Sequence, residues 1–115
     1  MNFATPAQAA HSGGVIGTAS FNAVGGSISS PTFDGVITKV ERRDTGQFTI
    51  TLSGQSDGNY IALVSLGGNG ADDTWSYVIP ARDKQTDSFN LEVRFRGSKS
   101  DDSDNIQIAV MRLSQ

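Results

Sequence analysis

The feature that most constrains this chain is an alternation of apolar and polar residues with a period of two, repeated between breaks rich in glycine and aspartate. The clearest run is 89–95, where Phe, Leu and Val alternate with Asn, Glu and Arg, and runs 48–52 and 106–110 alternate in the same way. Successive side chains of a β-strand point to opposite faces, so this pattern is typical of strands with one face in a core and one in water. We therefore expect half-buried antiparallel strands.

Four weaker segments, 17–22, 35–42, 59–66 and 74–79, raise the number of expected strands to seven. Most of the thirteen glycines lie in the breaks, where tolerance of positive φ suits a turn. Seven short strands in 115 residues predict one all-β domain, an antiparallel β-sandwich of jelly-roll-like type. Residues 60–66 would place apolar side chains on both faces of a strand. This predicts a central strand covered on both sides, by a partner sheet or another subunit.

The first residues differ from the rest because they show no period and are rich in Ala, Ser, Gly and Thr. We expect an extended N-terminal arm over residues 1–16 and the sandwich domain over 17–115. Ordering a residue costs about 1–2 kcal/mol of backbone entropy, and the arm has few large apolar side chains to offset that cost. An ordered arm would need contact with its own domain or with another chain. In the second case Phe3, its sole aromatic residue, and Pro6 would anchor it in the partner.

Composition argues against several classes of function. The net charge is −3 and the nine Lys and Arg residues are spread out, so neither nucleic acid nor an anionic membrane is an expected partner. The longest mainly apolar stretch, 60–66, is too short for membrane insertion. There is no cysteine, and the single histidine, His11, lies in the arm, which leaves a nucleophilic triad without its base. Glu41 and Glu92, the only glutamates, occupy outward strand positions, so we expect no enzyme and no cofactor.

The aspartates gather in the breaks. If consecutive strands run antiparallel, the turns at 43–46, 67–73 and 97–105 share one end of the sandwich with the arm, and an acidic rim forms there. Carboxylates at alternating positions suit a hard cation, but Asp also favours turns by bonding nearby backbone, so we assign no metal. The loop residues of this rim are Asp72, Asp73, Asp101, Asp102 and Asp104.

Trp75 and Tyr77 raise the question of sugar stacking, because exposed aromatic rings pack on pyranose faces. They alternate with Ser76 and lead into Ile79, which is the pattern of a strand facing a core. We therefore expect both rings in the core.

Several segments together carry a family resemblance. They are Ala-Ser-Phe-Asn at 19–22, Thr-Gly-Gln-Phe-Thr-Ile-Thr at 45–51, Asn-Tyr at 59–60, and the alternating strand, turn and closing strand of the last third. This set resembles the C-terminal modules of bacteriophage tail fibres and related virion receptor-binding proteins. The resemblance covers residues 17–113 and contains no catalytic signature.

The resemblance implies a non-enzymatic virion structural protein that is made in the host cytoplasm, displayed on the virion surface, and used for attachment to a host glycan or protein. Together with the apolar segment 60–66 and the small core, it implies a homotrimer. Because the chain carries its own Met1 and a short arm, we expect a spike, head fibre or decoration subunit whose arm binds other virion proteins. The alternative is a soluble carbohydrate-binding β-sandwich module that is not part of a virus.

Overall fold

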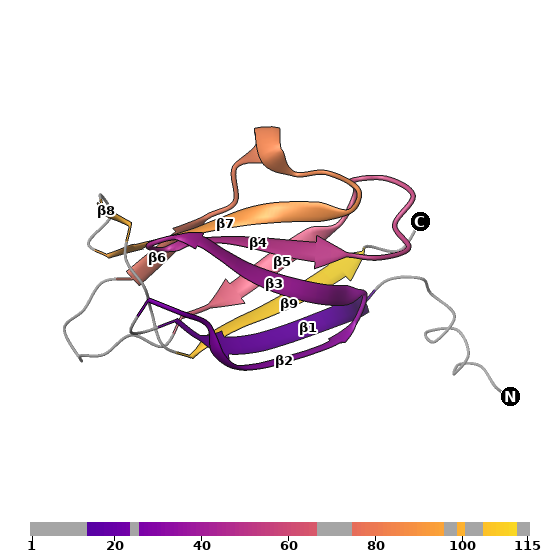
Figure 1. The fold of residues 1–115 in the computed structure, drawn as a ribbon. Helices are drawn as coiled ribbons and strands as arrows, with labels where there is room; N and C mark the ends of the chain where they lie inside the picture. Colours follow the sequence, from indigo (N-terminus) through magenta and orange to yellow (C-terminus); the bar gives the residue numbers. More distant parts are fainter. Residues whose placement is uncertain (1–13, 24–25, 67–74, 96–98, 101–104, 113–115) are drawn as a thin grey trace, which may run out of the picture.

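The structure is a computed structural model that describes residues 14–23, 26–66, 75–95, 99–100 and 105–112, without the side chains of 75, 95, 99 and 100. Its strands form two antiparallel sheets, which confirms the predicted β-sandwich (Figure 1). Sheet A has the strand order β2-β1-β9-β5, and sheet B has the order β3-β4-β7-β6, with β8 also paired to β7. The elements are β1 (Gly14–Asn22), β2 (Ser29–Gly35), β3 (Ile37–Asp44), β4 (Gln47–Leu52), β5 (Ile61–Ser65), β6 (Trp75–Val78), a 3-10 turn η1 (Ala81–Asp83), β7 (Ser88–Phe95), β8 (Lys99–Ser100) and β9 (Ile106–Arg112).

The core lies between the sheets, and the three segments with the clearest alternation build most of it. They become β4, β7 and β9, and each turns its apolar set inward. Phe21 of β1 meets Phe48 of β4 edge to face, with ring centroids 5.3 Å apart, and this contact joins the two sheets. The fully buried large side chains are Tyr60, Phe21, Phe48, Phe89, Ile50, Leu91, Ile106, Val93 and Val110.

Two strands, β2 and β8, are absent from the sequence prediction. β2 is exposed at every residue, so it has no apolar set to alternate, and its pairing with β1 holds it in place. Because β2 adds a strand between β1 and β3, the start of β1 lies at the opposite end of the sandwich from the one expected for the arm. Gly14 pairs with Arg112, at the end of the sandwich opposite the turn between β3 and β4 (Figure 1). Gly14 to Ile16, expected in the arm, belong to β1, and residues 1–13 lie outside the described residues.

The prediction of a central strand at 60–66 is wrong. β5 lies at the edge of sheet A, where β9 is its one strand neighbour among the described residues. Ala62 and Val64 pack against the core, whereas Ile61 and Leu63 are 40% and 49% exposed. An edge strand with an exposed apolar face has the same composition as a strand buried on both sides, so the sequence pattern does not separate the two.

The chain crosses from sheet A to sheet B at Val36, where two backbones approach closely. Gly17 and Gly35 face each other in the β1–β2 pairing, and Gly35 has a φ of +66°. A Cβ atom at Gly35 would lie 2.2 Å from the carbonyl oxygen of Ile16. That oxygen accepts the N–H of Val36 at 3.0 Å, and the N–H of Ser53 donates to the Val36 carbonyl at 2.9 Å. The glycines therefore permit the change of sheet that places β3 opposite β1.

Candidate functional site

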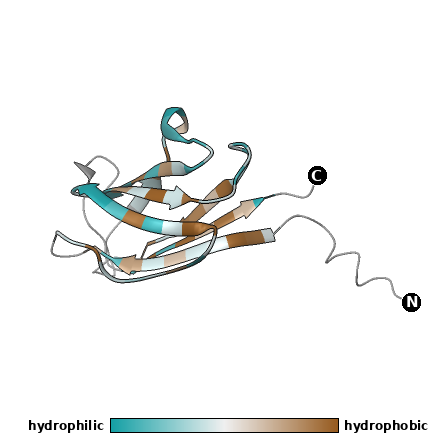
Figure 2. Ribbon diagram, turned by 45° about the vertical axis from the view of Figure 1, so that its right-hand side comes forward, coloured by the Kyte–Doolittle hydropathy of each residue, from teal (hydrophilic) through white to brown (hydrophobic). Residues whose placement is uncertain are grey.

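The outer faces of the two sheets differ in charge. Sheet B carries the ion pairs Lys39–Glu41 on β3 and Glu92–Arg94 on β7, with N–O distances of 3.1 and 2.9 Å. The outward residues of β1, β5 and β9 in sheet A are all uncharged, and Asp34 on the edge strand β2 is the one charge on that face among the described residues. Figure 2 shows β3 as largely hydrophilic and β1 as pale to hydrophobic over most of its length. Depletion of charge is the compositional mark of a contact surface.

Cross-strand pairing arranges the outward side chains of sheet A in three rows, because residues directly opposite each other point to the same face. Thr18 lies opposite Ala109, which lies opposite Leu63, and the neighbouring pairs set the other rows. The apolar row is Val15, Met111 and Ile61; the central row is Asp34, Thr18, Ala109 and Leu63; the polar row is Thr32, Ser20, Gln107 and Ser65.

A groove of about 550 Å³ lies over the central and polar rows. All four strands of sheet A contribute to its lining, so the sheet itself forms the floor. Because strands lie about 4.8 Å apart, each row presents side chains at that repeat across the sheet. The groove is therefore broad and shallow, with a regular pattern of contacts.

The polar side chains of this groove are free to bind a ligand. Thr18, Ser20, Thr32, Ser65 and Gln107 form no side-chain hydrogen bond with another described residue. Hydroxyl groups both donate and accept, and the Gln107 amide adds two donors and an acceptor.

Asp34 supplies the remaining polar group of the groove. One carboxylate oxygen accepts the N–H of Gly35 at 2.8 Å, and the second oxygen is an additional acceptor. No Lys or Arg of the described ranges lines the groove, so its chemistry suits an uncharged, hydroxyl-rich ligand and not an anion.

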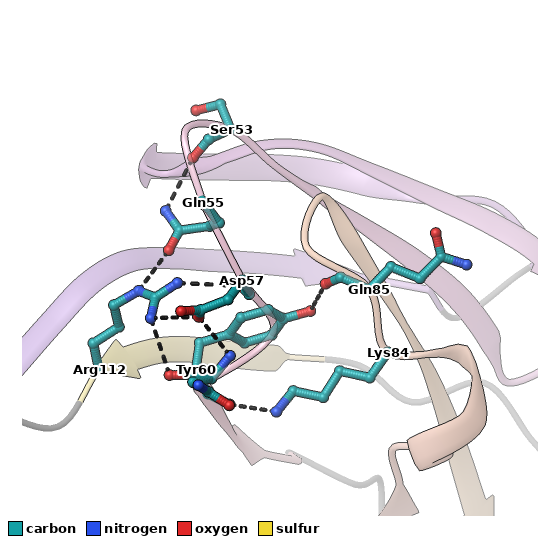
Figure 3. Close-up of polar contacts among 8 residues, drawn as sticks. Ser53, Gln55, Asp57, Tyr60, Lys84, Gln85 and Arg112 are labelled. Atoms are coloured by element: carbon teal, nitrogen blue, oxygen red, sulfur yellow. Dashed lines mark hydrogen bonds and ion pairs between the residues drawn. The ribbon is translucent and has the colours of Figure 1, made fainter.

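A second polar cluster, centred on Arg112, lies where β9 ends (Figure 3). Its guanidinium donates to the side chain of Gln55 at 2.8 Å, to the carboxylate of Asp57 at 2.9 Å, and to the carbonyl oxygens of Asp57 and Asn59, both at 3.2 Å. The N–H of Asn59 and the Arg112 guanidinium together lower the pKa of Asp57. These contacts hold the loop between β4 and β5 against β9, so this cluster is structural.

Tyr60, the residue before β5, is held in place by the segment between η1 and β7. It is 1% exposed, and its hydroxyl donates to the carbonyl of Gln85 at 2.6 Å (Figure 3). The carbonyl of Ser88 lies 3.1 Å from the same hydroxyl. The Nζ of Lys84 donates to the Tyr60 carbonyl and lies 4.5 Å from the ring centroid. Burial, with a smaller contribution from Asp87, raises the pKa of Tyr60 to about 12. The phenol is therefore neutral at ordinary pH and serves as a hydrogen-bond donor.

None of the candidate site residues singled out in the sequence that the structure describes lines the groove. Glu41 and Glu92 each pair with a basic residue of the same strand, outside the groove. Tyr77 packs against the core as predicted, and the Trp75 side chain is not described. Phe3, Pro6, Asp72, Asp73, Asp101, Asp102 and Asp104 lie outside the described residues.

Sequence reasoning missed the groove because its polar residues look like ordinary solvent-facing positions of strands. A usable signal was present in β1 and β9, whose outward positions carry Thr, Ser, Gln and Ala but no charge. Across the described part of the chain, no group of three or more His, Cys, Asp or Glu is placed to hold a metal ion, and no helix has the length and apolarity to cross a membrane.

Comparison of the chain with protein-family models, with curated proteins and with solved structures returns no match. What the outer face of sheet A can do is therefore inferred from its own chemistry.

Proposed function

We propose that this chain is a non-enzymatic virion surface protein, a spike, fibre or decoration subunit, that attaches to a host surface through the outer face of sheet A. The observation that carries the attachment role is the groove, which has Asp34 as its one charged residue among the described residues and polar side chains without a described hydrogen-bond partner. The virion setting is supported by the sequence resemblance to tail-fibre modules.

The ligand that fits this groove is a neutral glycan. A pyranose presents hydroxyl groups at its rim and C–H groups on its faces. The polar row offers hydrogen bonds to the hydroxyl groups, and Leu63 and Ala109 offer apolar contact to the C–H groups. Binding sites for small molecules combine apolar lining with a few placed polar groups in this way. An acidic glycan would find no cationic partner among the described residues that line the groove and would meet the charge of Asp34.

The same groove favours a second candidate function, a soluble carbohydrate-binding module that is not part of a virus. The two functions share the ligand class and differ in whether the chain is a component of a particle. Mass spectrometry of purified particles from the source of the gene separates them, because the first function requires the chain in the particle and the second does not.

An array of neutral and acidic glycans tests the attachment role. We expect the isolated chain to bind neutral glycans and Gln107→Ala to lose about two- to tenfold in affinity for each hydrogen bond removed, since such a bond contributes about 0.5–1.5 kcal/mol. Gln47→Ala, at the outer face of sheet B, is the matched control and should bind as the wild type does. Binding that is confined to acidic glycans, or an equal loss in both variants, would contradict the proposal.

A further inference from the structure

The four sheet edges of the sandwich are protected to different degrees. An unpaired strand edge presents free backbone donors and acceptors, and proteins protect such edges with charge, proline or short length. β2 contains Pro31 and Asp34, and β3 contains Lys39, Glu41 and Arg43. β6 has only four residues. β5 has none of these protections among the described residues.

β5 is an apolar edge on both of its faces. Its sequence is Ile-Ala-Leu-Val-Ser, with no charge, proline or glycine. Ile61 and Leu63 are exposed on the outer face of sheet A. On the inner side, a crevice of about 380 Å³ between the sheets is lined by Val64, Leu66, Ser76 and Tyr77. A strand added beside β5 would satisfy the backbone edge and cover apolar surface on both sides.

We infer that β5 pairs antiparallel with β5 of a second copy of this chain, about a two-fold axis at Leu63. In this register Leu63 faces Leu63 of the second copy, Ile61 faces Ser65, and Ala62 faces Val64. Every pair is uncharged and at least one member of each is apolar, so the strand is complementary to itself, as an isologous interface requires. Two-fold pairing also needs only this one unprotected edge.

The size of the contact sets its strength. A strand of five residues is about 17 Å long and the two sheets are about 10 Å apart, so the edge and its flanks bury a few hundred Å² per copy. A standard interface buries about 800 Å² per partner, so the dimer is weak and depends on concentration.

Pairing of this kind would make sheet A continuous across the dimer, with both outer faces on the same side. The two grooves would then lie side by side, and a surface with repeated ligands would be bound by both at once. Bivalent binding raises avidity without any new contact to the ligand. A two-fold assembly differs from the homotrimer implied by the sequence resemblance, because a three-fold axis cannot pair β5 with itself.

The test is the molar mass of the unliganded full chain by sedimentation equilibrium, from about 1 µM to about 500 µM. We expect the wild type to rise from one copy to two and Leu63→Lys to stay at one copy. The matched control is Phe33→Lys, on the opposite edge of sheet A, where a 43% exposed apolar residue receives the same charge. It should dimerise as the wild type does. Ser65→Lys, at an exposed polar position, replaces Leu63→Lys if that variant does not fold.

A wild type that stays at one copy throughout, a mass of three copies, or a dimer that survives both β5 lysine variants would overturn the inference. The mass is measured without glycan, so it is independent of the attachment role. Gln107→Ala should weaken glycan binding and leave the dimer intact, which keeps failure of the one proposal distinguishable from failure of the other.

Discussion

Replacing Tyr60 with Phe removes one hydroxyl from a fully buried ring and leaves the packing of the ring unchanged. The hydroxyl donates to the Gln85 carbonyl at 2.6 Å, and a typical intramolecular hydrogen bond contributes about 1 kcal/mol to stability. At pH 7 we therefore expect Tyr60→Phe to lose about 1 kcal/mol of unfolding free energy. For a domain of this size the loss lowers the melting temperature by about 3–6 °C.

The same variant should reverse its disadvantage at high pH. The folded-state pKa of Tyr60 is raised to about 12, whereas a tyrosine in the unfolded chain titrates near pH 10. Between these values the unfolded wild type releases a proton that the folded wild type keeps, so the wild type loses up to about 1.4 kcal/mol per pH unit. The loss reaches about 1.4 kcal/mol near pH 11, which exceeds the contribution of the hydrogen bond. The Tyr60→Phe variant has no phenol to titrate and no such loss, so the two stability curves should cross near pH 11.

Urea unfolding of both proteins at intervals from pH 7 to pH 12 measures this difference. All other titrating groups are common to the two proteins and cancel. A constant difference across the whole range would show that Tyr60 is not held neutral by its burial, and equal stability at pH 7 would show that its hydroxyl contributes nothing.

Three further predictions concern the frame that supports the groove. Arg112→Gln should speed amide exchange in the loop between β4 and β5 and raise the pKa of Asp57 in an NMR titration, though not fully to its ordinary range, because the N–H of Asn59 remains. Gly35→Ala should cost at least about 1 kcal/mol more in denaturant unfolding than Gly54→Ala. Gly35 and Gly54 both have a positive φ, which costs about 1–2 kcal/mol for alanine. Of the two, only Gly35 also has a backbone oxygen at the position where the added Cβ would lie. Phe48→Ala should lose about 3–5 kcal/mol in the same assay, since the ring is fully buried in edge-to-face contact between the sheets.

The sequence predicted the sandwich well where one face of a strand is buried. β4, β7 and β9 alternate because their inward sets fill the core and their outward sets point away from it. This local pattern is what a half-buried strand requires, so it can be read without knowledge of the partner strands.

The pattern failed where a strand is defined by its neighbours and not by burial. β2 is exposed throughout and exists because β1 offers it a backbone edge, and missing it reversed the expected placement of the N-terminal side. β5 was assigned to the centre of a sheet because its apolar composition does not distinguish a strand buried on both sides from an edge strand with an exposed apolar face. The groove was missed for the same reason, since its rows arise from the register of four strands distant in the sequence.

Amide chemical-shift mapping of the chain, during titration with a neutral oligosaccharide selected by the array, locates the bound ligand on the protein. We expect the largest shifts on Thr18, Ser20 and Gln107, on the floor of the groove in β1 and β9. We expect little change at Gln47 and Asn90 on the outer face of sheet B. Shifts concentrated on sheet B or on the turns, with β1 and β9 unchanged, would contradict the proposed attachment role.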